Sequence, residues 1–226
     1  ILLKDRKRPM TVKERFLITG HKFLDWHHFD SDPIGAPIER QLIAQVKNNL
    51  PRVEKVIVAD YRHGLLSERT ASAIVALCRK AHVPLYVDSQ IVHAQGNHRW
   101  YEGATLVSLN LKEAIAVDPL FDKEKLKLSL GRLKKILSAK GIVVKLAGDG
   151  SAALIGTKYI RTAVPYKVNA VDPTGAGDAF LASLALGKTP LTAQDFKRAN
   201  MWAALATTIV GTEPPSRAEL EKILRE

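Results

Sequence analysis

The feature that most constrains this chain is an alternation of short hydrophobic runs with amphipathic segments, which starts near residue 40. Residues 40–50 are predicted to be helical, and a β-branched run over 53–59 predicts a strand. Ser67 is a favoured N-cap residue, so we expect a helix over 68–81. Further strands are predicted over 84–87, 104–109, 141–146, 152–155, 158–160 and 164–168, and further helices over 123–139, 178–186 and 195–210. Strand–helix–strand alternation is typical of a parallel sheet with crossover helices, so the sequence predicts an α/β fold.

Polar residues directly follow three of these strands: Asp60, Asp88 and Asn110. In a parallel sheet, ligands bind beyond the carboxyl ends of the strands, so the three side chains are predicted to share one rim. Asp and Asn are also favoured in turns, which leaves a purely structural role open for each of them. Three such residues in succession favour the shared rim.

Residues near the N-terminus have a different pattern. Two segments, over 11–19 and 22–29, mix β-forming with charged residues, which predicts an exposed two-stranded ribbon. The segment DPIGAP over 32–37 predicts a linker. We therefore expect two units, a β ribbon over 1–30 and an α/β domain over 31–226.

The ribbon also contains four potential metal ligands: Asp25, His27, His28 and Asp30. In an alternating strand, however, His27 and His28 point to opposite faces and cannot easily share an ion. A solvated surface is therefore the better interpretation, because closed metal sites need convergent ligands.

Composition fits a globular domain and excludes several classes of protein. The 226 residues are 46% hydrophobic and 25% charged, which is ordinary globular usage. The longest apolar runs fall far short of the roughly 20 residues that a membrane-spanning helix needs, so no membrane partner is expected. The single cysteine, Cys78, permits no disulfide within the chain and favours a reducing compartment, so we expect a cytoplasmic protein.

The net charge of +11, from 34 basic and 23 acidic residues, is compatible with three kinds of partner. These are nucleic acids, acidic membranes and phosphorylated small molecules. Nucleic-acid binding is not expected, because basic and aromatic residues are nowhere interleaved as a stacking platform requires. The basic block over 123–140 carries leucines at helical spacing, so its lysines are predicted to line the solvated face of a helix.

One segment, VDPTGAGDAF over 171–180, points directly to chemistry. Two glycines remove side chains at the start of a predicted helix, so backbone amides there can approach an anion. Asp178 falls in the first turn of that helix, where its carboxylate can take a proton from an attacking hydroxyl. This combination favours transfer of a phosphoryl group, in which positioning and charge stabilisation supply most of the catalysis.

Three other interpretations of this segment fit less well. A dinucleotide fingerprint needs a third glycine where Phe180 stands, although Asp195 follows at the spacing which that motif requires. A Walker loop is excluded because its glycine–lysine string does not occur. A glycine-rich helix cap without a ligand does not need the aspartates at 172 and 178.

The segment DPTGAGD over 172–178 resembles the C-terminal signature of the ribokinase-like (PfkB) carbohydrate kinases. Other motifs of that family are resembled, in the expected order, by residues 60–66 (DYRHGLL), 87–90 (VDSQ) and 108–113 (SLNLKE). Residues 8–15 and 101–106 resemble more particularly the heptose-7-phosphate kinase branch. The resemblance implies a three-layer αβα sandwich with a mainly parallel sheet and a small β lid formed by the ribbon.

The resemblance also implies roles for individual residues. Asp178 would deprotonate the acceptor hydroxyl, and the anion hole for the transferred phosphoryl group would be formed by Gly175, Ala176 and Gly177. Asn110 and Glu113 would help to hold Mg²⁺ and the nucleotide phosphates, Glu113 through water. The other implied nucleotide-binding residues are Lys145, Asp172, Thr174, Asn200, Ala203 and Ala204, the last three beside the adenine, and the implied sugar-binding residues are Asp60 and Asp88. The expected function is ATP-dependent and Mg²⁺-dependent phosphorylation of a sugar or sugar phosphate, with a phosphorylated heptose favoured.

The sequence departs from the family's pattern at several positions. His63 and Gln90 stand where the family has lysines, which removes fixed positive charge from the rim, and Leu109 and Ala147 replace a proline and a glycine. The family also begins with further sheet that supplies much of the sugar site, so this chain either lacks that part or is a reduced relative. Two alternatives therefore stay open: a nucleoside or small-alcohol kinase, and a nucleotide-binding subunit without catalysis.

Apolar residues of the ribbon, such as Phe16, Ile18 and Trp26, need a cover, because an isolated two-stranded ribbon is marginal in water. In this family, the lids of two subunits often pack against each other in a dimer. The resemblance therefore implies a homodimer formed through the ribbon.

Overall fold

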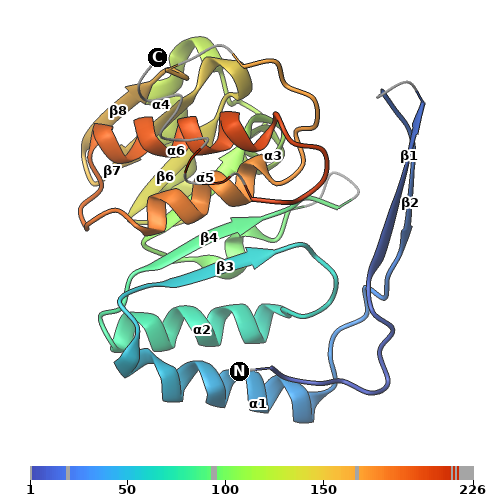
Figure 1. Cartoon of the computed structure of the whole chain (residues 1–226). Coiled ribbons are helices and arrows are strands. Elements are labelled where there is room, and N and C mark those ends of the chain that lie inside the picture. Colours follow the sequence, from blue (N-terminus) through green and yellow to red (C-terminus); the bar gives the residue numbers. More distant parts are fainter. Residues whose placement is uncertain are drawn as a thin grey trace.

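The computed structural model of the chain describes residues 2–18, 21–92, 96–165, 168–214, 216 and 218. Its main feature is a six-stranded sheet with the order β3-β4-β5-β6-β7-β8 (Figure 1). The strands are β3 (Val56–Asp60), β4 (Leu85–Ser89), β5 (Leu106–Asn110), β6 (Gly141–Lys145), β7 (Ser151–Ile155) and β8 (Lys158–Thr162). Strands β3 to β6 pair in parallel, whereas β6–β7 and β7–β8 pair antiparallel. The mainly parallel sheet that the sequence predicts is confirmed.

Helices cover both faces of this sheet and complete a three-layer αβα sandwich (Figure 1). The helices are α1 (Ala36–Asn49), α2 (Glu68–Lys80), α3 (Leu111–Val117), α4 (Leu126–Ile136), α5 (Ala176–Ala185) and α6 (Ala193–Ala206), and 3₁₀ helices span Leu50–Arg52, His98–Tyr101, Lys123–Lys125 and Ala147–Asp149. The first four α-helices share one core cluster with the sheet, while α5 and α6 pack on the opposite face through a second cluster.

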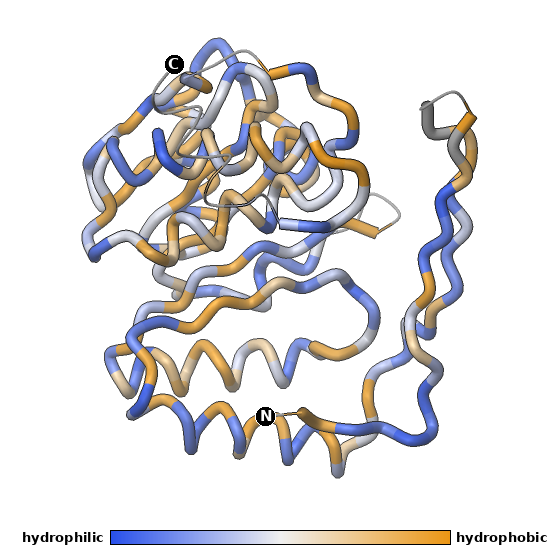
Figure 2. Tube along the Cα trace, viewed as in Figure 1, coloured by the Kyte–Doolittle hydropathy of each residue, from blue (hydrophilic) through white to orange (hydrophobic). Residues whose placement is uncertain are grey.

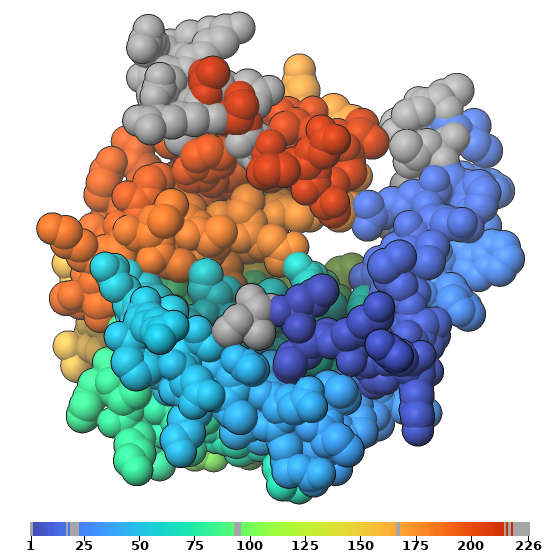
Figure 3. Space-filling view, turned by 60° about the horizontal axis from the view of Figure 1, so that its bottom comes forward, coloured from blue at the N-terminus to red at the C-terminus, as the bar shows by residue number. Residues whose placement is uncertain are grey.

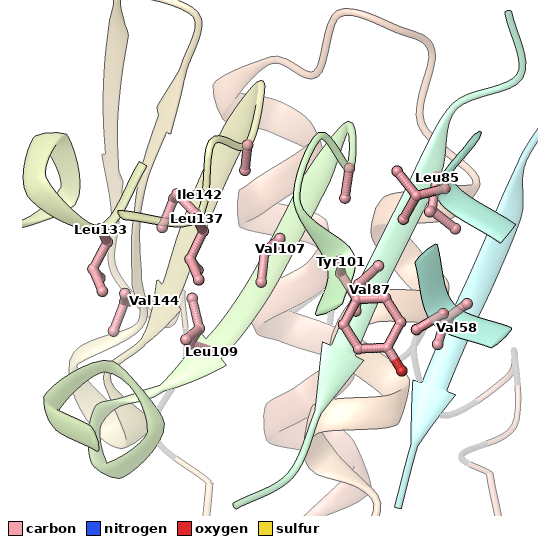
Figure 4. Close-up of a cluster of buried hydrophobic side chains, with 14 of the residues drawn as sticks. Val58, Leu85, Val87, Tyr101, Val107, Leu109, Leu133, Leu137, Ile142 and Val144 are labelled. Carbon is pink, nitrogen blue, oxygen red and sulfur yellow. The ribbon is translucent and has the colours of Figure 1, made fainter. Parts of the chain in front are cut away.

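The inner strands are hydrophobic along almost their whole length, because helices bury both of their faces. Val107 and Ile142 are completely buried, as is Leu133 of α4, which packs in the same cluster. Figure 4 shows this cluster extending from Leu133 at one end to Val58 at the other. The core thus fixes the strands whose carboxyl ends carry the predicted rim.

Most predicted helices and strands form within a few residues of their expected bounds. Ser67 caps α2 as predicted, since its hydroxyl accepts a hydrogen bond from the Thr70 N–H at 3.1 Å. The strand predicted over 164–168 is wrong for its described residues, because Val164, Pro165 and Val168 belong to no strand. Pro165 has no N–H to donate to a strand ladder, which explains the difference. Residues 166 and 167 lie outside the described residues.

The ribbon stands beside this body, on the side toward which β3 and β4 point (Figure 1). Its strands β1 (Val12–Ile18) and β2 (His21–His28) pair antiparallel, with a bulge after Phe16. Directly opposed residues share a face of such a pair, so the register defines two faces. The outer face carries Val12, Glu14, Phe16, Leu24, Trp26 and His28, and the inner face carries Lys13, Arg15, Asp25 and His27. Figure 2 shows the resulting mixture of hydrophobic and hydrophilic residues along the ribbon.

Two absences hold for the described part of the chain. No group of three or more His, Cys, Asp or Glu side chains there could together hold a metal ion, and His27 and His28 lie on opposite faces of the ribbon, as predicted. None of its helices combines the length and the hydrophobicity needed to cross a membrane.

Candidate active site

The carboxyl ends of β4 and β6 and the first turn of α5 meet at one place. The Lys145 ammonium at the end of β6 donates a hydrogen bond to the Asp88 carboxylate on β4. A Cβ atom on Gly177 would lie 3.3 Å from Lys145 Nζ and 4.0 Å from Asp88 Oδ2. The absence of a side chain at 177 therefore lets the start of α5 approach this ion pair closely.

The loop before α5 is held in a shape that presents backbone amides. Gly175 is the N-cap of α5 and has φ +80°, a left-handed conformation that glycine adopts readily. Asp172 accepts hydrogen bonds from the Thr174 N–H (2.9 Å), the Thr174 hydroxyl (2.6 Å) and the Gly211 N–H (3.0 Å). Burial alone would raise the pKa of Asp172, but these hydrogen bonds outweigh it and hold the pKa below its usual value. Asp172 and Thr174 thus shape the loop through these hydrogen bonds.

Asp178 lies in the first turn of α5, beside this loop. Burial raises the pKa of its carboxyl group, and the Asp88 charge acts in the same direction. A hydrogen bond from Tyr61 and the charges of Lys145 and Lys13 oppose that rise. A carboxylate whose pKa is moved toward neutrality is a better proton acceptor, while the cations and Tyr61 favour its charged form.

Asn110 and Glu113 form two reciprocal hydrogen bonds at the start of α3. The Asn110 side-chain oxygen accepts from the Glu113 N–H at 2.9 Å, and the Glu113 carboxylate accepts from the Asn110 N–H at 2.7 Å. This capping box leaves Glu113 only 3% exposed. Burial raises its pKa to about 7, and Asp88 and Lys145 act on it with opposite signs. Glu113 is therefore close enough to the Asp88–Lys145 pair to share its electrostatic field.

Asp60 is buried, with both carboxylate oxygens engaged. Its Oδ2 accepts hydrogen bonds from Ser89 (3.2 Å), Asn97 (2.7 Å) and Tyr101 (2.8 Å). Its Oδ1 accepts from the Arg62 N–H at 2.9 Å. The rim predicted from the strand ends thus divides in two: Asp88 meets Lys145 near α5, whereas Asp60 orders the loops after β3 and β4.

A pocket of about 400 Å³ opens between α5 and α6, next to Asp178. It is lined by Thr174, Gly175, Asp178, Ala179, Ala182, Ser183, Leu186, Trp202, Ala206, Thr212, Glu213 and Pro214. Its mostly apolar walls and its polar end at Thr174, Gly175 and Asp178 suit a flat base with phosphates attached.

The three residues expected beside the adenine lie on α6 but outside the lining of this pocket. Asn200 is buried and donates hydrogen bonds to the hydroxyl (2.9 Å) and carbonyl (3.1 Å) oxygens of Thr162. Ala203 and Ala204 are half-buried on the same helix, but the pocket takes Trp202 and Ala206 instead. The structure therefore brings Asp88, Lys145, Gly177 and Asp178 together and leaves Asn200, Ala203 and Ala204 outside the lining of this pocket.

The inner face of the ribbon reaches the site at several points. Arg15 pairs with Asp25 across the ribbon (3.3 Å) and also lies 4.0 Å from Asp172 in the loop before α5. The Phe29 and His63 rings lie 4.5 Å apart, which joins the end of β2 to the loop after β3. In Figure 3 an opening separates the ribbon from the orange and red C-terminal part of the body.

Sequence reasoning missed three residues of this site. Tyr61 contacts Asp178, and Lys13 and Arg15 approach from the ribbon. Tyr61 lies in the segment over 60–66 that resembles a family motif, so a signal for it was present. Lys13 and Arg15 could be found only as alternate residues of a predicted strand, which does not say what that strand contacts.

Comparison with known proteins gives one family. A model of the pfkB family of carbohydrate kinases matches residues 39–218 of this chain. The bifunctional protein HldE of Campylobacter curvus (strain 525.92) is 28% identical over 234 residues, which cover 100% of this chain and 47% of that protein. The bifunctional protein HldE of Geobacter sulfurreducens is 27% identical over 223 residues, covering 97% of this chain and 45% of that protein. This chain thus spans less than half the length of these curated relatives.

Solved structures with a similar fold agree with this match. Phosphofructokinase-2 from Escherichia coli, in complex with substrates and products, superposes with a TM-score of 0.74 at 17% identity, covering 95% of this chain and 69% of that chain. Ribokinase from Arabidopsis thaliana, complexed with ribose and ATP, gives a TM-score of 0.68 at 19% identity, covering 90% and 66%. The ribokinase-like fold that the sequence motifs imply is confirmed.

Proposed function

Because this chain belongs to the pfkB family of carbohydrate kinases, we propose that it transfers the terminal phosphoryl group of ATP to a hydroxyl group of a sugar or sugar phosphate. The observation that carries this proposal is the position of Asp178 in the first turn of α5, beside the Asp88–Lys145 pair and at the polar end of the pocket. A base, the N-terminal amides of α5 and a nucleotide-sized pocket therefore adjoin one another.

In the proposed reaction, Asp178 takes the proton of the acceptor hydroxyl while that oxygen bonds to the terminal phosphorus. The bond from this phosphorus to the bridging oxygen breaks, and ADP leaves. The first-turn amides at Gly175, Ala176 and Gly177 would stabilise the charge on the transferred group, as helix N-termini do for anions. The pocket between α5 and α6 would hold the adenine, with Trp202 as an aromatic wall.

The oxygen donors at the rim fit Mg²⁺, which prefers carboxylate, carbonyl and water ligands. We propose that Asn110 and Glu113 hold it together with the nucleotide phosphates, Glu113 through water because its carboxylate is already engaged in the capping box. Bound there, Mg²⁺ would neutralise phosphate charge. Asp88 would remain beside the acceptor, while Asp60 would order the loops around it.

The acceptor that we favour is a phosphorylated heptose, since residues 8–15 and 101–106 resemble the heptose-7-phosphate kinase branch. ATP as donor favours a cytoplasmic location. We also propose a homodimer, because the outer face of the ribbon leaves Phe16 45% and Trp26 62% exposed, and a second ribbon would cover them.

The test is turnover with Mg²⁺–ATP and a panel of free sugars, sugar phosphates, nucleosides and small alcohols, followed by ³¹P NMR. We expect ADP and a new phosphate monoester to appear together with at least one sugar or sugar phosphate. Transfer to nucleosides alone would favour the nucleoside-kinase alternative. ATP binding without transfer to any acceptor would favour a catalytically silent subunit, an alternative that the uncharged Gln90 and the histidine at 63 keep open.

A further inference from the structure

Lys13 on β1 points a positive charge at the ring of Tyr61. Its ammonium nitrogen lies 5.7 Å from the centroid of that ring, within the range of a cation–π contact. Tyr61 directly follows β3, and its ring lies 6.2 Å from that of His63. Lys13 belongs to the inner face of the ribbon, so this contact joins the ribbon to the body.

Tyr61 also interacts with Asp178, through its hydroxyl group. Burial together with the Asp178 carboxylate raises the pKa of Tyr61 to about 12, and hydrogen bonding by the Tyr61 hydroxyl in turn lowers the pKa of Asp178. At neutral pH the phenol therefore stays protonated and remains a donor. A cation over the face of a phenol ring stabilises negative charge on that ring and so strengthens the donated hydrogen bond.

Several further contacts hold Lys13 in this place. Arg15, two residues along the same face, reaches Asp172 in the loop before α5. The Thr11 hydroxyl lies 3.5 Å from His63 Nδ1, and Phe29 packs on the His63 ring at 4.5 Å. The ribbon therefore meets the site through four different residues, and Lys13 lies among them.

The charge of Lys13 also matters because two nearby rim positions carry no fixed positive charge. Gln90 is uncharged, and burial lowers the pKa of His63, with Lys13 and His27 adding to that effect. His63 is therefore less readily protonated than a free histidine.

We propose that Lys13 is a positioning residue of the active site, supplied by the ribbon, which acts on Asp178 through the ring and the hydroxyl group of Tyr61. This inference rests on the proposed function, in which Asp178 is the base. It makes the ribbon part of the catalytic arrangement as well as a cover for the acceptor.

The sign of the effect follows from the groups that face Asp178. Asp88 on β4 raises the pKa of Asp178, whereas Lys145 on β6, Tyr61 after β3 and Lys13 on β1 lower it. Removing the Lys13 charge or the Tyr61 hydroxyl therefore raises that pKa. Because the base must be ionised, the acidic limb of the kcat profile should move to higher pH in both variants.

The experiment compares Lys13→Met, Tyr61→Phe and the double variant, with Lys13→Arg as charge rescue. Lys47→Met, at an exposed position on α1, is the control for loss of one positive charge elsewhere. We expect Lys13→Met to lower kcat about fivefold, the size of a cation–π contact, with KM for ATP unchanged. Lys13→Arg should restore kcat to within roughly twofold. In the Tyr61→Phe background, the effect of Lys13→Met on kcat should be smaller than in the parent, because only the direct action of the Lys13 charge on Asp178 remains.

Two results would overturn the inference. One is an unchanged kcat and acidic limb in Lys13→Met. The other is an equal effect of Lys13→Met with and without the Tyr61 hydroxyl, which means that the two residues act independently. The ¹³C titration of the Asp178 carboxyl group, assigned with Asp178→Asn, gives the same comparison without turnover. If no acceptor is phosphorylated, the proposed function fails, and this titration still decides whether Lys13 acts on Asp178 through Tyr61.

Discussion

The inner strands of the sheet and the two strands of the ribbon use hydrophobic residues in opposite ways. Val87, Val107 and Ile142 are fully buried between two layers of helices. On the ribbon, Phe16 and Trp26 are 45% and 62% exposed. The body is therefore held by apolar packing, whereas the ribbon is placed on it mainly through the ion pair and ring contacts of its inner face.

This difference assigns a separate task to each region: the body fixes the site residues, and the ribbon covers them. A densely packed body fixes Asp88, Lys145 and Asp178 relative to one another, because close-packed interiors do not deform continuously. A two-stranded ribbon is marginal by itself, so a few contacts decide where it lies. An element that is placed by few contacts suits a lid, which must open to admit substrate and close over it.

The largest expected difference between the body and the ribbon is in the stability lost when a phenylalanine is replaced by alanine. Phe180 of α5 is 1% exposed, so Phe180→Ala should lower the free energy of unfolding by about 3–5 kcal/mol. Phe16→Ala on the ribbon should lower it by less than about 1 kcal/mol, because that side chain already meets water. Urea denaturation of both variants, at a concentration at which the chain is monomeric, measures the two values. Equal losses would break the comparison, since they would mean that the outer face of the ribbon is packed within the single chain.

A smaller effect is expected in the pocket of the body. Ala206 lines the pocket, so Ala206→Leu should weaken ATP binding by about 1–3 kcal/mol through overpacking. Ala204→Leu, on the same helix but outside the lining, is the matched control. Isothermal titration with ATP measures both affinities. A larger loss in Ala204→Leu than in Ala206→Leu would place the adenine beside Ala203 and Ala204, where the family resemblance implies it.

The smallest change in the stability of the single chain is expected on the outer face of the ribbon. Trp26→Asp replaces an exposed ring, so the free energy of unfolding should change by only about 0.5 kcal/mol. The same substitution should shift the protein from dimer toward monomer in sedimentation and raise KM for the sugar. A parent protein that sediments as a monomer at micromolar concentration would contradict the proposed ribbon-to-ribbon dimer.

The fold of the body could be predicted because its signals are local. Hydrophobic runs, the Ser67 cap and the glycines before α5 each determine structure within a few residues. The convergence of Asp88 with Lys145 also follows from the rule that parallel strands end at one edge.

The surroundings of Asp60 and Asp178 could not be predicted in the same way. Asp60 receives its hydrogen bonds from Asn97 and Tyr101, which lie 37 and 41 residues further along the chain. Tyr61 and Asp178, which interact, lie 117 residues apart in the sequence. The contacts of Lys13 and Arg15 depend on how the ribbon lies on the body, and strand periodicity alone does not contain that information.

The most direct test of the account is transfer of labelled phosphate from [γ-³²P]ATP to the accepted sugar by the parent protein and by Asp178→Asn. Loss of a positioned base should lower the rate of labelled product formation at least about 100-fold, while ATP affinity stays within roughly twofold of the parent value. Asp178→Glu keeps a carboxylate but displaces it, so its rate of labelled product formation should fall between those of the parent and of Asp178→Asn. Near-parental transfer by folded Asp178→Asn would contradict the assignment of Asp178 as the base and, with it, the catalytic site described here.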